Sequence, residues 1–332
     1  MIANVASVSE TGAILMGKYL SCDGFDEGRE AGILTHFHGD HIENLESCLQ
    51  NYGKIFVTPA TRNVLIAIKG DWLEIRRNLV SKNFFDSFDY RDERITFYPT
   101  THTLGSAQIL VETDDCRILN TGDFREGTVP IEVDILIVDS TYGSPQFNRK
   151  YMRDLAVKTL VSKVKEGLKV GPVCISANRG KLQESMNILY TADIEVPLLF
   201  HRKIVKISEV FRYHGHEIGE FLVIGTEEAE EILRSGQPHI AFYPDRSYIY
   251  GEEKYMLIRV SDWDRVSPLY SQIAGKKYII GLPDHCEFKG ILEFVKSCSP
   301  KLVITDAYRS ANAGHLARHI RSKLGIQAIP MP

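Results

Sequence analysis

Short apolar runs separated by polar turns fill the first 148 residues of the chain. The runs that have the length of strands lie at 32–34, 109–112, 117–120 and 135–138. The polar residues at 113–115 are typical of a hairpin turn between two of these strands, and the spacing at 60–68 favours a helix. The pattern predicts a β-rich α/β domain at the start of the chain.

The pattern changes near residue 149, where longer helical and apolar segments alternate. We predict helices at 152–166 and after Gly180, and strands at 172–176 and 196–201, an order that favours a small parallel sheet. After residue 256 short strands return, at 277–280 and 302–305, and each precedes a helical run. We therefore predict that a domain of residues 149–255 is inserted into a discontinuous domain of residues 1–148 and 256–332.

The loop after the strand at 32–34 concentrates residue types that bind metals: His36, His38, Asp40 and His41. In an extended segment His36 and His38 point the same way, whereas Asp40 and His41 lie beyond the turn at Gly39. One such loop can serve two metal ions roughly 3.5–4 Å apart, an arrangement that hydrolyses phosphate and carbonyl centres.

Two later strand ends supply further candidates. His102 follows an aromatic-rich strand, and Asp123 follows the strand at 117–120. We predict that His102 is the third imidazole for the first metal and that Asp123 is a carboxylate shared by both metals.

Together these residues resemble the metal signature of the metallo-β-lactamase superfamily. The resemblance implies an α/β fold, an αββα sandwich, with an acid upstream that orients a metal-bound histidine. Asp23 fits that role, and Asp26 is the competing assignment. The apolar strand at 135–138, followed by Asp139-Ser140-Thr141-Tyr142-Gly143, resembles the first signature of the β-CASP nucleases.

Two later segments extend the β-CASP resemblance. It implies that His285 pairs with Asp139 and acts as a general acid. The RNA-cutting members carry a histidine for the second metal where this chain has Asp306, whose carboxylate can also bind zinc. DNA-cutting members depart from histidine at the same place, so the choice between RNA and DNA stays open.

The length and the motifs resemble the compact β-CASP proteins, which are called RNA 3′-end-processing factors and ligase-associated DNA exonucleases. This implies an inserted β-CASP α/β cap domain and a nuclease for RNA or single-stranded DNA that works as a homodimer or in a processing or repair complex. It also implies two Zn²⁺ ions. The expected ligands are His36, His38 and His102 for one ion, Asp40, His41 and Asp306 for the other, and Asp123 for both. The expected catalytic residues are Asp40, Asp139 and His285.

Two alternatives share the metal loop. A small-molecule hydrolase such as a thioesterase or lactonase does not require the segment 139–143 or a cap of about 100 residues. A catalytically silent scaffold of an RNA-processing assembly does not require a complete ligand set.

The net charge of −4 argues against a large basic surface. Residues 149–250, however, carry 15 lysines and arginines against 13 acids, and five acids of the remainder belong to the proposed site. Within this segment, two loops between a strand and a helix can hold phosphate groups. They contribute Arg179 and Lys181, and Arg202 and Lys203.

Composition bears on membrane contact, disulfides and the cellular compartment. No apolar run approaches about 18 residues and no secretory leader follows Met1, so we expect no membrane contact. The six cysteines include no CxxC pair, which favours buried thiols over disulfides. We therefore expect a cytoplasmic protein.

Overall fold

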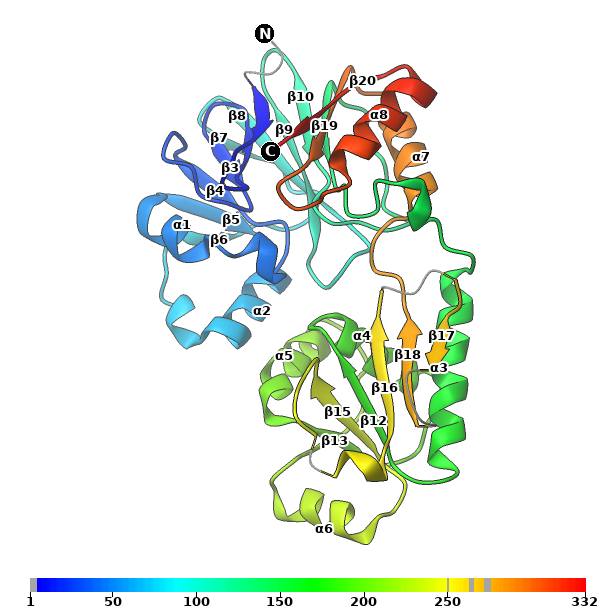
Figure 1. Cartoon of the computed structure of the whole chain (residues 1–332). Helices are drawn as coiled ribbons and strands as arrows, with labels where there is room; N and C mark the ends of the chain where they lie inside the picture. Colours follow the sequence, from blue (N-terminus) through cyan, green and yellow to red (C-terminus); the bar gives the residue numbers. More distant parts are fainter. Residues whose placement is uncertain (1–4, 250, 263–265, 272–275) are drawn as a thin grey trace. The chain divides into compact units, whose positions relative to one another are not determined.

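The computed structural model of the chain describes residues 5–249, 251–262, 266–271 and 276–332. The chain divides into two compact units (Figure 1). The first runs up to Asn148 and resumes at His285, and the second is Arg149–Asp284. Across the described residues, none of the helices combines the length and apolarity needed to span a bilayer.

The first unit contains two sheets. In the first sheet the strands stand in sequence order: β1 (Ala6–Val8), β2 (Ile14–Met16), β3 (Leu20–Cys22), β4 (Ala31–Ile33), β5 (Lys54–Val57) and β6 (Leu79–Ser81). The second has the order β20 (Gln327–Met331), β19 (Leu302–Asp306), β11 (Ile135–Val138), β10 (Arg117–Asn120), β9 (Ala107–Glu112), β8 (Glu93–Pro99) and β7 (Phe88–Tyr90).

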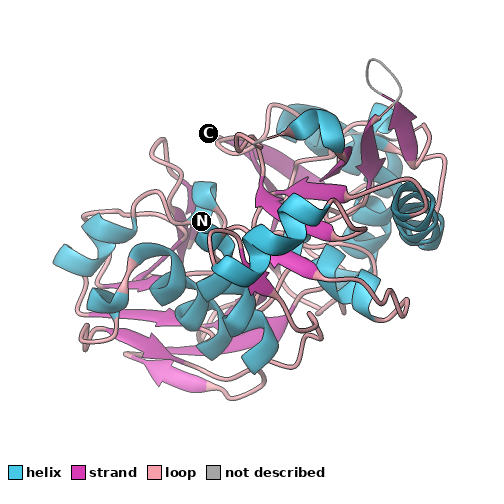
Figure 2. Cartoon of the chain, turned by 90° about the horizontal axis from the view of Figure 1, so that it is seen from below, coloured by secondary structure: helices cyan, strands magenta, loops and turns pink. Residues whose placement is uncertain are grey.

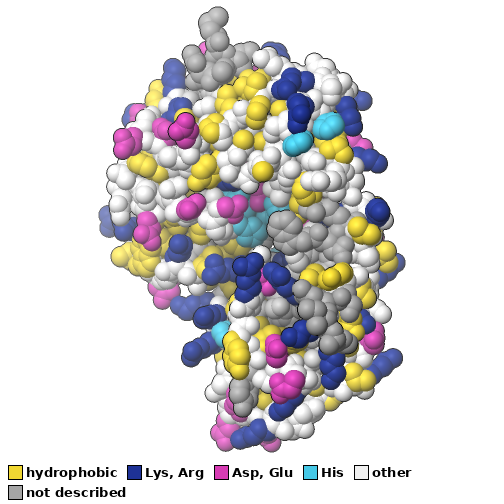
Figure 3. Space-filling view, viewed as in Figure 1, with side chains coloured by type: hydrophobic (Ala, Val, Ile, Leu, Met, Phe, Trp, Pro, Cys, Tyr) yellow, Lys and Arg dark blue, Asp and Glu magenta, His cyan; other side chains and the backbone are white. Residues whose placement is uncertain are grey.

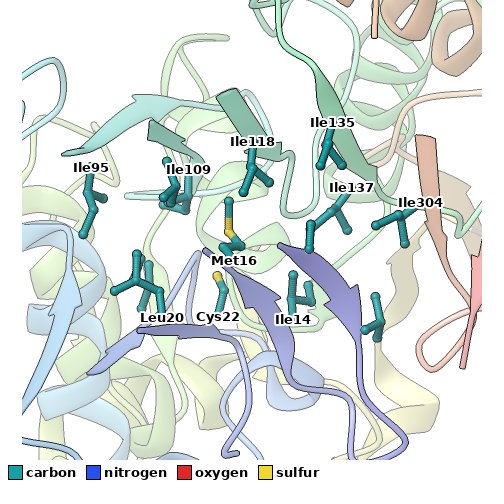
Figure 4. Packing of buried hydrophobic residues seen from close by; sticks show 14 of the residues in the cluster. Ile14, Met16, Leu20, Cys22, Ile95, Ile109, Ile118, Ile135, Ile137 and Ile304 are labelled. Atoms are coloured by element: carbon teal, nitrogen blue, oxygen red, sulfur yellow. The ribbon is translucent and has the colours of Figure 1, made fainter. Parts of the chain in front are cut away.

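Apolar side chains from both sheets form the core between them (Figure 4). Met16 and Leu20 of the first sheet and Ile109, Ile118 and Ile135 of the second belong to one buried cluster. Because side chains alternate along a strand, the opposite face of the second sheet has its own apolar residues, which pack against helices α7 (Phe288–Cys298) and α8 (Ala313–Leu324).

The helices α1 (Leu45–Asn51) and α2 (Pro59–Lys69) connect the parallel strands β4, β5 and β6. Thr58 begins α2 because its hydroxyl accepts a hydrogen bond from the amide of Thr61, and Pro59 occupies the first turn. Figure 2 shows the helices and strands of the chain by type. The two packed sheets, with α7 and α8 against the second and α1 and α2 connecting strands of the first, confirm the predicted αββα sandwich.

The second unit is built on one sheet whose strands are parallel except for β17. Its order is β14 (Leu222–Val223), β13 (Leu198–Phe200), β15 (Ile240–Pro244), β12 (Val173–Ala177), β16 (Met256–Ser261), β18 (Lys277–Gly281) and β17 (Leu269–Ser271). The helices of this unit are α3 (Arg153–Leu168), α4 (Lys181–Tyr190), α5 (Arg202–Tyr213) and α6 (Glu227–Ser235).

The boundary between the units differs from the predicted one. We predicted that the chain returns to the first domain at residue 256, but β16 pairs with β12 and β18 pairs with β16 in the second sheet. The second unit therefore ends at Asp284. Hydrophobic periodicity identifies a strand but does not say which sheet it joins, and this is the reason for the difference.

Candidate metal centre

Four predicted ligands from three loops of the first unit meet at one place. Each of His36, His38, His102 and Asp123 offers one atom, and these atoms lie within 4.8 Å of one another. The rings of His36 and His38 are 4.7 Å apart, as expected if both point the same way from the loop after β4. The rings of His36 and His102 are 4.9 Å apart.

The loop that carries His102 is fixed to helix α2. The carbonyl oxygen of Gly105 accepts hydrogen bonds from the hydroxyls of Thr58 and Thr61, at 2.7 and 3.0 Å. Gly105 has a φ of +76°, and a β-carbon there would lie 2.6 Å from the amide nitrogen of Thr61. Only glycine fits this close approach, which sets the position of the loop.

The carboxylate of Asp123 lies among the histidines. Its Oδ2 is 3.4 Å from Nε2 of both His36 and His102, and its Oδ1 is 3.3 Å from Nε2 of His41. Nε2 of His36 and Nε2 of His41 are buried without a hydrogen-bond partner among the described residues. Buried imidazole nitrogens that converge on a carboxylate in this way fit a bound dication such as zinc.

Electrostatics support this interpretation for His36 and Asp123. Burial, followed by the nearby His41, lowers the pKa of His36 well below its ordinary value, so this imidazole is neutral as metal binding requires. Burial alone would raise the pKa of Asp123, but His41 and His285 outweigh it and hold that pKa well below the usual range.

An acid of the first sheet holds His41 in place. Oδ2 of Asp23 lies 2.8 Å from Nδ1 of His41, and the same carboxylate accepts hydrogen bonds from the amide and hydroxyl of Thr35. Burial opposes a proton on His41, yet the carboxylates of Asp123 and Asp23 raise its pKa well above the ordinary value. The competing candidate, Asp26, caps a turn at Gly28.

The predicted pair of Asp139 and His285 is also present. Oδ2 of Asp139 is 3.1 Å from Nδ1 of His285, and Oδ1 of Asp139 accepts a hydrogen bond from the amide of Thr141. Nε2 of His285 is 3.9 Å from Oδ2 of Asp123, so the pair adjoins the four-ligand cluster. The ring of Tyr142 lies edge-on to that of His285, at 5.6 Å.

Two predicted metal ligands, Asp40 and Asp306, lie outside the four-ligand cluster. Oδ2 of Asp40 is 3.6 Å from Nε2 of His41, but the Asp40 side chain is 61% exposed. Asp306 does not join the cluster. Its carboxylate accepts a hydrogen bond from the guanidinium of Arg309 and two from the amides of Tyr308 and Arg309. The strand end that we predicted to supply a metal ligand supplies a buried ion pair instead.

Sequence reasoning missed Arg309, although an arginine three residues after a buried acid was a visible signal for an ion pair within one turn. Its side chain is only 8% exposed.

Histidine and acidic side chains lie side by side on the visible face of the molecule (Figure 3).

The four predicted phosphate-binding residues lie on the second unit. Arg179, Arg202 and Lys203 are exposed. Lys181 is not available for phosphate, because its ammonium is buried, lies 2.7 Å from Asp284 and donates to the carbonyl of Leu282. The first turn of α4 turns this side chain inward, and we correct its assignment to a structural ion pair.

No family model matches the chain. Curated proteins do. An "uncharacterized protein in lig 3′ region" of Acidianus ambivalens is 36% identical over 128 residues, which are 37% of this chain and 91% of that protein. An "RNase J-like protein" of Methanocaldococcus jannaschii is 29% identical, over 44% of this chain and 39% of that protein.

A third relative is "cleavage and polyadenylation specificity factor subunit 3-I" of Arabidopsis thaliana, which is 29% identical over 47% of this chain and 27% of that protein. The chain thus spans well under half the length of the two longer curated relatives. A crystal structure of a protein of unknown function from Enterococcus faecalis V583 has a TM-score of 0.67 at 11% identity, over 93% of this chain and 81% of that one. This likeness is one of fold.

Proposed function

This chain belongs to the β-CASP branch of the metallo-β-lactamase superfamily, and we propose that it is a metal-dependent nuclease that hydrolyses phosphodiester bonds. The observation that carries the proposal is the adjacency of two groups of side chains. One is the four-ligand cluster of His36, His38, His102 and Asp123, and the other is the His285–Asp139 pair, which adjoins it through Asp123.

His36, His38, His102 and Asp123 would hold the dication, which would supply Lewis-acid activation of water and of a phosphate. The remaining chemistry belongs to side chains. In the imidazolium form of His285, the carboxylate of Asp139 accepts a hydrogen bond from Nδ1–H, and Nε2–H is directed toward the cluster. Nε2 then gives a proton to the departing 3′ oxygen, and the product keeps a 5′ phosphate. Asp23 and Thr35 hold the metal loop in register during this exchange.

Zinc is the metal that we propose, because imidazole nitrogens and a carboxylate oxygen are its usual ligands and it can expand to a fifth position that takes water. We further propose nucleic acid as the substrate and an intracellular role in RNA 3′-end processing or in DNA repair. The names of the relatives from Methanocaldococcus jannaschii and Arabidopsis thaliana support the RNA alternative, and the name of the Acidianus ambivalens relative, which refers to lig, suits the DNA alternative. Exposed Arg179, Arg202 and Lys203 are the proposed phosphate contacts.

The test is incubation of the purified chain with end-labelled RNA and DNA, single and double stranded, with zinc and after chelation. We expect zinc-dependent products with 5′ phosphates, and a loss of at least about 100-fold in His38→Ala, because a ligand should matter no less than the groups that merely orient ligands. His315→Ala, which removes an exposed histidine of α8, is the matched control and should cleave normally.

The product ladder distinguishes cutting within the strand from cutting at its end. Zinc-loaded protein that leaves every oligonucleotide intact and hydrolyses a simple thioester would replace the nuclease by a small-molecule hydrolase. Undiminished cleavage by His38→Ala would remove the metal cluster from the mechanism.

A further inference from the structure

The position where the family resemblance implies a ligand for a second metal is filled differently in this chain. β19 ends at Asp306, which is 6% exposed. Oδ2 of Asp306 accepts a hydrogen bond from Nη1 of Arg309 at 2.9 Å, and Oδ1 accepts from two backbone amides of the same turn. A charge-assisted bond and two amide bonds hold both oxygens, so neither is directed to a metal.

Arg309 is fixed at its other end by backbone oxygens of the first sheet. Its Nη2 donates to the carbonyls of Gly12 and Asp23, at 2.9 and 2.8 Å. Asp23 is the residue whose carboxylate holds His41. Arg309 is therefore linked through Asp23 to His41, the imidazole that a second metal would need.

The charge of Arg309 acts on the same groups. Burial disfavours this cation, but the carboxylates of Asp23, Asp306 and Asp123 raise the pKa of Arg309. Arg309 thus places a fixed positive charge against the Asp306 carboxylate and the backbone of Asp23, and a like charge disfavours a dication beside them. The guanidinium of Arg309 thus already supplies part of the positive charge that a second dication would bring.

The remaining donors for a second ion are poorly assembled. Nε2 of His41 lies 3.6 Å from Asp40 and 3.3 Å from Asp123, but among the described residues the three do not form one group within 4.8 Å, whereas the first cluster does. Asp40 is also largely exposed to solvent. Without the Asp306 carboxylate, these three donors form a weaker site than the four-ligand cluster.

We propose that this chain holds one tightly bound dication and that the Asp306–Arg309 ion pair replaces the second. The single ion lies at His36, His38, His102 and Asp123. Arg309 occupies the Asp306 carboxylate and supplies part of the positive charge that a second ion would bring. The proposal deepens the proposed function and rests on its metal centre.

The first measurement is metal stoichiometry of the intact chain. Metal-free protein is titrated with zinc and with manganese by calorimetry, and metal content after gel filtration is measured by mass spectrometry. We expect one tight equivalent per chain, lost in His102→Ala. Two equivalents that bind wild-type protein with similar affinity would overturn the proposal whether or not any variant folds.

The second measurement uses Arg309→Gln, which frees the Asp306 carboxylate and removes the cation. We expect the second equivalent to bind at least about 10-fold more tightly than in wild type, the size of effect seen when groups around metal ligands change. Arg309→Lys keeps the charge and should stay at one equivalent. Arg212→Gln is the matched control, because Arg212 also pairs with an acid three residues away, Glu209, but in the second unit.

Unchanged stoichiometry in a folded Arg309→Gln protein would contradict the role given to the ion pair. Failure of this proposal and failure of the proposed function remain distinguishable, since the first appears as a metal count and the second as an absence of oligonucleotide cleavage by metal-loaded protein.

Discussion

The carboxylate of Asp139 lies 3.1 Å from Nδ1 of His285 and orients this ring. If His285 protonates the leaving oxygen, its removal should lower the rate of only those reactions whose leaving group needs that proton. We predict that His285→Ala lowers oligonucleotide cleavage about 10²–10⁴-fold but lowers hydrolysis of a p-nitrophenyl phosphodiester less than about 10-fold, because p-nitrophenolate leaves unprotonated. Rates on the two substrates, measured with zinc-loaded protein, provide the test.

Asp139→Asn should give the same split between substrates with a smaller loss, since the imidazole remains. Equal losses on both substrates would show that His285 serves the metal or the fold and donates no proton. Metal content, measured in parallel, should equal that of wild type.

At the residue scale, the sequence predicted most of the metal cluster but not the ion pairs of Asp306 and Lys181. Most of the cluster was visible as histidines and acids behind apolar strands, because ligand chemistry needs rare residue types at strand ends. Asp306 was ambiguous, because a buried acid can bind a metal or an arginine, and the nearby Arg309 allowed both. The prediction for Lys181 failed for a different reason, since its partner Asp284 lies 103 positions away in the chain.

At the scale of elements, the loop between β8 and β9 depends on Gly105. We predict that Gly105→Ala destabilises the first unit by about 1–3 kcal/mol and weakens zinc binding. The reasons are the positive φ and the clash with the backbone of Thr61, which would displace the loop of His102. Chemical denaturation and zinc titration of the same preparation measure both effects.

Gly39→Ala is the matched control, because Gly39 belongs to the metal loop and a β-carbon there meets no atom within 4 Å. We expect a stability change within about 0.5 kcal/mol. If Gly105→Ala proves as mild as Gly39→Ala, the close approach to α2 does not determine the position of His102.

Elements were predicted well where the pattern was local. The hairpin of β9 and β10 and the strand β11 lie where turn residues and apolar runs indicated. The sheet that a strand joins depends on distant pairing, and for this reason β16 and β18 were assigned to the wrong unit. Five of the six cysteines are buried, as the sequence favoured, whereas Cys116 is half-buried.

At the scale of the whole molecule, the four proposed metal ligands all belong to the first unit. A ligand that binds only the folded state stabilises it, by about 2.7 kcal/mol at 100 times its Kd. We therefore predict that chelation lowers the unfolding temperature of one calorimetric transition and leaves that of the second unit unchanged. In His38→Ala the chelator should have little effect. A uniform shift of both transitions would contradict this assignment.

Because the inserted unit interrupts the first unit, the two parts of the first unit are synthesised at separate times. His36, His38, His102 and Asp123 leave the ribosome first, but β19, which pairs with β11 inside the second sheet, comes only after the whole of Arg149–Asp284. The nascent chain must keep the edge of β11 unpaired while the inserted unit folds. A growing chain therefore acquires its proposed metal ligands well before His285, the proposed proton donor, which follows directly after the inserted unit.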